Sequence, residues 1–168
     1  MVALIGPFSP SLLGSELARL EGRLEGLLVP FDLRKVREAL AVVRDAVRAG
    51  TVHSAHDVSD GGLAAAVTES ALQGGVGVAL DVEPLMHRAQ VDARTALFGE
   101  GPGGVVVSGT RAALLELSTT ANAAGVGFVA LGTVGGANIG IAAGTARIDS
   151  SLEDAGSLFV SALAERLS

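Results

Sequence analysis

The sequence contains no cysteine, no tryptophan and no tyrosine, and only five phenylalanines among its 168 residues. The absence of cysteine excludes disulfide bonds and thiolate metal sites, and it favours a reducing compartment such as the cytoplasm. Because aromatic side chains are so few, the core has to be built from alanine, valine, leucine and isoleucine. The 23 glycines allow backbone segments to approach one another closely in such a core.

Positive charge is also scarce, since the formal net charge is −6 and Lys35 is the only lysine. Without a basic patch or a set of aromatic stacking residues, we expect no binding to nucleic acid. No apolar run is long enough to span a membrane. The apolar opening, Met1 to Phe8, lacks a basic leader and is interrupted by Gly6 and Pro7, so we expect no signal peptide. These features predict a cytoplasmic protein without membrane contact.

The length predicts a single domain. The order of the expected elements, which mixes crossovers with late hairpins, predicts an α+β fold with a mixed sheet covered by helices on both faces. Residues 1–30 would form a first strand and a connector. The expected strands are 2–5, 52–55, 76–82, 105–107, 126–131, 138–142 and 145–148. The expected helices begin at the caps Ser15, Asp32 and Thr110, near Leu63, at Val91 and at Ser151, with 84–90 a loop or a short helix. In the last helix, Leu152, Leu158, Phe159, Leu163 and Leu167 are expected to face the core.

The most informative stretch runs from Ser54 to Leu63 and reads Ser-Ala-His-Asp-Val-Ser-Asp-Gly-Gly-Leu. It predicts a buried strand that turns through short polar residues and two glycines into a helix. The unpaired N–H groups at such a helix start favour an anion. Asp57 and Asp60 would repel a bare phosphate, and a Mg²⁺ ion between them and the phosphate would remove that conflict.

Each polar residue of this stretch has a structural alternative. Ser59 or Asp60 can simply cap the helix that follows. His56 is in the position of a general base, although a histidine at the end of a strand is more often structural. Glu100, in a second glycine-rich turn, could hold a ribose hydroxyl or a metal, or could accept N–H bonds from its own turn. No set of nucleophile, base and orienting residue is present, so we assign no catalytic residue.

The segment His-Asp-Val-Ser-Asp-Gly-Gly-Leu resembles the C-terminal-domain signature of the phosphoribosylformylglycinamidine synthase family. That family lies within the superfamily of proteins related to aminoimidazole ribonucleotide (AIR) synthetase. The resemblance covers about residues 9–145. It departs from the family at Gly99 and Gly101, where serine is expected, and at Gly104, where arginine is expected. The other matching segments begin at Leu13, Gly50, Leu97, Ala124 and Leu131.

The resemblance implies a three-layer C-terminal domain of an ATP-dependent synthetase that converts an amide into an amidine with glutamine-derived ammonia, in purine biosynthesis. By analogy with the family's related signature, Asp57 would bind the metal. The nucleotide or phosphate contacts would be Ser59, Asp60, Gly61, Gly62 and Glu100. ATP and Mg²⁺ would be the cofactors of the whole enzyme.

The family's catalytic histidine, its lysine and most of its metal-binding acids belong to N-terminal-type domains that this chain lacks. We therefore expect residues 1–168 to be one domain of a larger synthetase, inactive alone. The expected partners are the N-terminal-type domains, a glutaminase component and a second copy in a homodimer. Two alternatives stay open. One is another member of the superfamily, namely AIR synthetase, thiamine-monophosphate kinase or selenophosphate synthetase. The other is a non-catalytic regulatory or scaffold domain.

Overall fold

The computed structural model describes residues 1–23 and 30–167, and it confirms the α+β class with a mixed sheet. The strands are β1 (Val2–Ile5), β2 (Ser54–Asp57), β3 (Val78–Asp81), β4 (Val105–Ser108), β5 (Phe128–Val134), β6 (Asn138–Ala143) and β7 (Ala146–Ser151). They form one sheet in the order β2-β4-β1-β5-β3-β6-β7. Neighbouring strands are antiparallel except β3 and β6, which are parallel.

Local capping sets the start of several helices, as the sequence predicts. Ser15, Asp32 and Thr110 each accept a hydrogen bond from a backbone N–H in the first turn of the helix that follows. The helices are α1 (Glu16–Leu20), α2 (Leu33–Arg48), α3 (Gly62–Gly74), α4 (Glu83–Ala89), α5 (Ala93–Phe98), α6 (Arg111–Ala123) and α7 (Leu152–Leu167). In the described chain no helix combines the length and the apolar character needed to span a membrane.

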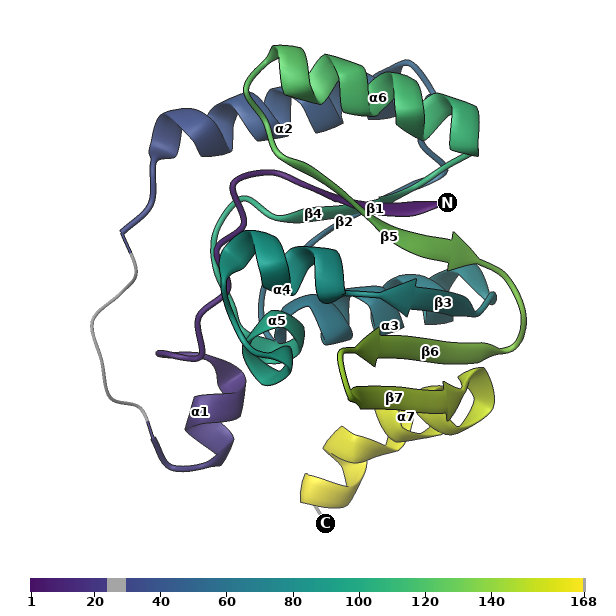
Figure 1. Cartoon of the computed structure of the whole chain (residues 1–168). Helices are drawn as coiled ribbons and strands as arrows, with labels where there is room; N and C mark the ends of the chain where they lie inside the picture. The colour runs from purple at the N-terminus through teal and green to yellow at the C-terminus, as the bar shows by residue number, and fades with distance from the viewer. Residues whose placement is uncertain (24–29, 168) are drawn as a thin grey trace.

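The helices lie in two layers, one on each side of the sheet (Figure 1). Strand alternation divides the core between them, because successive side chains point to opposite faces. In β1, Ala3 and Ile5 pack with α2 and α6, while Val2 and Leu4 pack with the layer that contains α3, α4 and α5. This arrangement is the three-layer α/β/α sandwich that the family resemblance implies.

The signature strand differs from the sequence prediction in position and in burial. The expected strand was 52–55, but the observed strand is Ser54–Asp57, because its length and register follow the four residues of β4 that it pairs with. The prediction that this strand is buried is wrong. Three of its four residues are exposed, since β2 is the outermost strand of the sheet.

The last helix also differs from its predicted orientation. Leu152 is partly buried and packs against the core, as expected. Leu158 and Phe159 were expected to face inward, but they are 67% and 64% exposed. The helix has only its first turns against β7 and α3, so later apolar positions lack a core to contact. The side chains of Leu163 and Leu167 lie outside the described residues.

Candidate functional site

Antiparallel pairing of β2 with β4 brings the two glycine-containing loops together. Asp57 at the end of β2 lies opposite Val105 at the start of β4, and Val58 N–H donates to the Gly104 carbonyl at 2.8 Å. The loop after β2 and the turn before β4 consequently line one cavity of about 430 Å³, walled on its other side by α2. Its lining includes Val36, Leu40, residues 57–60 and residues 100–105. All the acidic site residues named from the sequence, Asp57, Asp60 and Glu100, are in this lining.

The two glycines of the signature are required by the backbone. Gly61 and Gly62 have φ values of +78° and +73°, which side-chain-bearing residues rarely adopt. A Cβ on Gly62 would lie 2.8 Å from the Gly99 carbonyl oxygen and 2.8 Å from the Phe98 carbonyl carbon. Gly62 therefore allows α3 to begin directly against the end of α5.

The start of α3 is not capped as the sequence suggested. Gly61 occupies the N-cap position, and neither Ser59 nor Asp60 provides a side-chain cap, so that prediction is wrong. The Glu100 carboxylate takes this role from 39 residues away, because its Oε1 accepts the Gly61 N–H at 2.9 Å. The same oxygen accepts the Glu16 N–H, the first of α1, at 2.8 Å.

Glu100 thus holds two helix starts with one carboxylate oxygen. A negative charge is favourable at both places, since the backbone N–H groups there carry partial positive charge. A purely local structural role for Glu100 would require N–H donors from its own turn. The donors instead come from two other segments of the chain. Its main chain also exchanges two hydrogen bonds with Ser11, at 2.9 and 3.0 Å. The turn before β4 is consequently tied to the segment that leads into α1.

Asp57, Ser59 and Asp60 keep their side chains unengaged. In the described part of the chain, none of the three forms a side-chain hydrogen bond, and Asp57 and Asp60 are exposed. No group of three or more metal-ligating side chains converges anywhere within those residues. Any cation held here would take one or two carboxylates from this chain and its remaining ligands from elsewhere, a pattern typical of Mg²⁺ with phosphate.

His56 is engaged on both ring nitrogens. Nδ1 lies 2.8 Å from the Asp57 carbonyl oxygen, and Nε2 lies 3.2 Å from Glu69 Oε2 on α3. These contacts fix the strand to the helix that follows it, which agrees with the structural alternative for this histidine.

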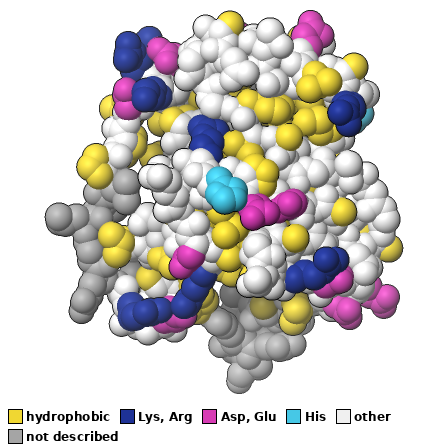
Figure 2. Space-filling view, viewed as in Figure 1, with side chains coloured by type: hydrophobic (Ala, Val, Ile, Leu, Met, Phe, Trp, Pro, Cys, Tyr) yellow, Lys and Arg dark blue, Asp and Glu magenta, His cyan; other side chains and the backbone are white. Residues whose placement is uncertain are grey.

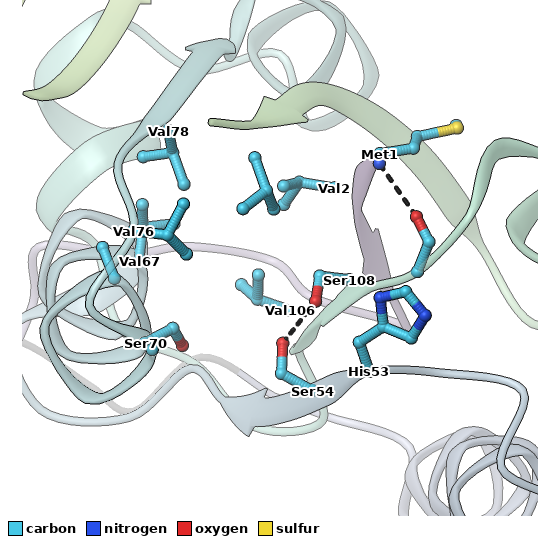
Figure 3. A pocket seen from close by; sticks show the side chains of 14 residues that line it. Met1, Val2, His53, Ser54, Val67, Ser70, Val76, Val78, Val106 and Ser108 are labelled. Carbon is cyan, nitrogen blue, oxygen red and sulfur yellow. Dashed lines mark hydrogen bonds between the residues drawn. The ribbon is translucent and has the colours of Figure 1, made fainter. Parts of the chain in front are cut away.

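A second cavity of about 430 Å³ lies between α3 and the sheet, and valine is the commonest residue in its lining (Figure 3). Its serines are already paired, since Ser54 Oγ and Ser108 Oγ are 2.7 Å apart and Ser70 Oγ donates to the Ala66 carbonyl. Among the described residues of its lining, His53 carries the one titratable side chain. This cavity therefore offers fewer titratable side chains for acid–base chemistry than the cavity beside Asp57.

The charged side chains in the candidate site are all acidic. The described residues that line the cavity beside Asp57 include three carboxylates and no lysine or arginine. On the face shown in Figure 2, acidic and basic side chains are scattered among neutral ones. Outside this cavity, the Arg88 guanidinium donates to the Gly6 carbonyl at 3.0 Å, and desolvation lowers the pKa of Arg88. A bare phosphate in the cavity would meet repulsion unless a cation accompanied it.

Comparison with known proteins supports the resemblance read from the sequence. The family model described as "AIR synthase related protein, C-terminal domain" matches residues 4–143. The PurL subunit of phosphoribosylformylglycinamidine synthase from Nocardioides sp. is 43% identical over 136 residues, covering 80% of this chain and 17% of the relative. The same subunit from Renibacterium salmoninarum is 36% identical over 133 residues, covering 79% of this chain and 17% of the relative. The chain therefore spans about a sixth of the length of these relatives.

Solved structures show the same fold. Thermotoga maritima PurL complexed with FGAR superposes with a TM-score of 0.75 at 12% identity, covering 92% of this chain and 27% of that one. The T. maritima protein complexed with ATP gives a TM-score of 0.72 at 12% identity, covering 92% and 25%. At this identity the likeness concerns the fold, and it confirms the predicted three-layer architecture.

Proposed function

Because the chain belongs to the AIR synthase related protein, C-terminal domain family, we propose that it serves as the C-terminal-type domain of a phosphoribosylformylglycinamidine synthase. The whole enzyme would convert formylglycinamide ribonucleotide, glutamine and ATP into the corresponding amidine in purine biosynthesis. The relatives that match most of this chain carry that name. The T. maritima neighbours, complexed with FGAR and with ATP, agree with these substrates.

The observation that carries the proposal is the single cavity formed by the signature loop and the Glu100 turn. Its free carboxylates, Asp57 and Asp60, are hard oxygen donors, and no cationic side chain among the described lining residues competes with a metal. This donor set fits Mg²⁺, with Asp57 as the residue we assign to it. When bound, the ion would neutralise phosphate charge. Asp57 would orient it, and Ser59, Asp60, Gly61, Gly62 and Glu100 would shape the phosphate side of the nucleotide site.

The arrangement also explains why other domains are needed. Stabilising a phosphorylated intermediate requires cationic groups or a metal, and the described lining of the cavity supplies no cationic side chain of its own. We assign those groups, and the catalytic base, to N-terminal-type domains of the same synthetase, with ammonia from a glutaminase component. The chain alone would then be inactive. A homodimer is a further proposed partner, supported by the exposed run Leu158, Phe159 and Val160 on α7.

One observation favours a second function, a non-catalytic regulatory or scaffold domain. The arginine expected from the family is replaced by Gly104, where a Cβ would lie 2.7 Å from the Phe8 ring. A domain that had lost its ligand site could lose this residue without harm.

The deciding experiment uses the full-length protein that contains this chain. ADP release is measured with formylglycinamide ribonucleotide, ATP, Mg²⁺ and either ammonia or glutamine. We expect substrate-dependent turnover, and a fall of about tenfold or more for Asp57→Asn. The matched control is Asp149→Asn, which removes an exposed carboxylate on β7. Turnover that is absent in the unmodified protein, or equal in both variants, would contradict the assignment.

A further inference from the structure

The cavity between α3 and the sheet lies at the opposite end of the signature strand from Asp57. In the register of β2 with β4, Asp57 pairs with Val105, and Ser54 pairs with Ser108. The first pair borders the candidate site, whereas both serines line this second cavity. The second half of α3 forms its other wall. Among the described residues the two cavities share no lining residue, so they are separate sites.

Small side chains leave this space open. The rest of the same core layer is filled by larger residues, among them Leu4, Leu63 and Leu85. The floor of the cavity consists of four valines and one alanine, each at most 8% exposed: Val2, Val67, Ala71, Val78 and Val106. Protein interiors are normally close-packed, so a hollow of about 430 Å³ over a buried apolar floor is an exception. Its volume lies in the range of small-molecule sites.

Hydrogen-bonding side chains gather on one side of the cavity. Figure 3 shows Ser54, Ser108 and His53 across the cavity from Val67 and Val78. The two serine hydroxyls lie 2.7 Å apart, and in the described part of the chain neither has another partner. Their mutual bond uses one of two O–H donors, so one donor and further acceptor positions remain for a ligand. The cavity is therefore apolar at one end and polar at the other.

The lining offers no charged side chain to pair with an ionic ligand. Among its described residues there is no lysine, arginine, aspartate or glutamate. The Met1 amino group at the rim already donates to the Gly109 carbonyl at 2.9 Å. Removing an ionised group from water without a partner is costly, whereas a neutral amide or hydroxyl needs only hydrogen bonds. The lining therefore favours an uncharged ligand.

We propose that this cavity binds a small uncharged aliphatic molecule that ends in an amide or a hydroxyl group. The aliphatic part contacts Val67, Ala71 and Val78, and the polar end exchanges hydrogen bonds with Ser54 and Ser108. The described lining contains no phenylalanine, so contact with aliphatic groups, and not ring stacking, stabilises the ligand. This inference is independent of the nucleotide chemistry assigned above.

The test measures probe binding to the full-length protein that contains this chain, by isothermal titration calorimetry. The probes are hexanamide, acetamide, hexanoate and hexylammonium. We expect hexanamide to bind with a Kd of about 1 mM or tighter. The other three should bind at least about tenfold more weakly, because acetamide lacks the aliphatic part and the last two carry a charge.

Two variants locate the probe. Ala71→Leu fills the floor of the cavity, and the double variant Ser54→Ala/Ser108→Ala removes both hydroxyls. Each should weaken hexanamide binding by about tenfold. The matched controls, Ala112→Leu on α6 and Ser157→Ala on α7, change exposed residues outside the cavity and should leave binding unchanged.

Thermal melts establish whether Ala71→Leu is folded, and if it is not, the serine double variant at the rim decides alone. Three results would each overturn the proposal. The first is that hexanamide does not bind. The second is that hexanoate or hexylammonium binds as tightly as hexanamide. The third is that the cavity variants and their controls have equal effects on hexanamide binding.

Discussion

Glu100 Oε1 lies 2.9 Å from the backbone nitrogen of Gly61, and it accepts the N–H that a phosphate at the start of α3 would otherwise use. The carboxylate therefore acts as a built-in anion at this helix start. Since Glu100 Oε1 also accepts the Glu16 N–H, the orientation of the signature loop depends on a residue of the second loop.

Replacing Glu100 tests the double cap. Glu100→Ala removes the acceptor for two N–H groups, and we expect the free energy of unfolding to fall by about 1–3 kcal/mol. Glu100→Gln keeps an acceptor oxygen and should lose less. Urea denaturation of both variants measures the difference. The control, Glu116→Ala, changes an exposed glutamate on α6 and should stay within about 0.5 kcal/mol of the unmodified chain.

Gly62 tests the close approach of α3 to α5. Gly62→Ala combines a positive φ of +73° with a Cβ only 2.8 Å from main-chain atoms, so we expect a loss of about 2–4 kcal/mol. Gly75→Ala has a similar φ of +61° but open space around its Cβ. It should lose only the conformational part, about 1 kcal/mol. Equal losses for the two variants, measured by thermal melts with calorimetry, would rule out the steric explanation.

Asp57 is predicted to matter for ligand binding and not for folding. Its side chain forms no hydrogen bond within the described structure and shares the cavity with Asp60. Asp57→Asn should leave the stability of the chain unchanged within about 0.5 kcal/mol, or raise it slightly. Magnesium–nucleotide binding by the full-length protein should weaken. A stability loss of about 1 kcal/mol with unchanged nucleotide binding would instead identify Asp57 as a structural cap.

Asp92 is predicted to make the free energy of unfolding depend on pH. The hydrogen bond from the Thr95 N–H, 2.7 Å from Asp92 Oδ1, lowers the pKa of Asp92 below its usual 3.8. When a carboxyl group has a lower pKa in the folded state than in the unfolded state, it stabilises the fold at pH values above its unfolded-state pKa. This stabilisation is lost as the pH falls through its folded-state pKa. We therefore expect Asp92→Asn to flatten the acid limb of the stability curve below about pH 4. An unchanged limb, from urea titrations at several pH values, would refute the cap at α5.

The sequence determined the features that depend on neighbouring residues. Asp32 and Thr110 accept N–H groups two or three positions ahead, so their helix starts are readable locally. The order of the expected elements, with helices between the early strands and hairpins among the last ones, likewise predicted the α+β class. The sequence motif of residues 56–63 identified the family, because this exact order of residue types is far more specific than a helix or strand pattern.

Tertiary structure alone decided how these parts work together. Glu100 accepts N–H groups from Gly61 and Glu16, which lie 39 and 84 positions away from it in the chain. No local sequence rule identifies donors at such distances. The exposure of β2 follows from strand order, because an apolar-flanked strand is buried at the centre of a sheet and open at its edge. Leu158 and Phe159 show the same limit, since helical spacing predicts one face but only packing determines whether that face meets a core.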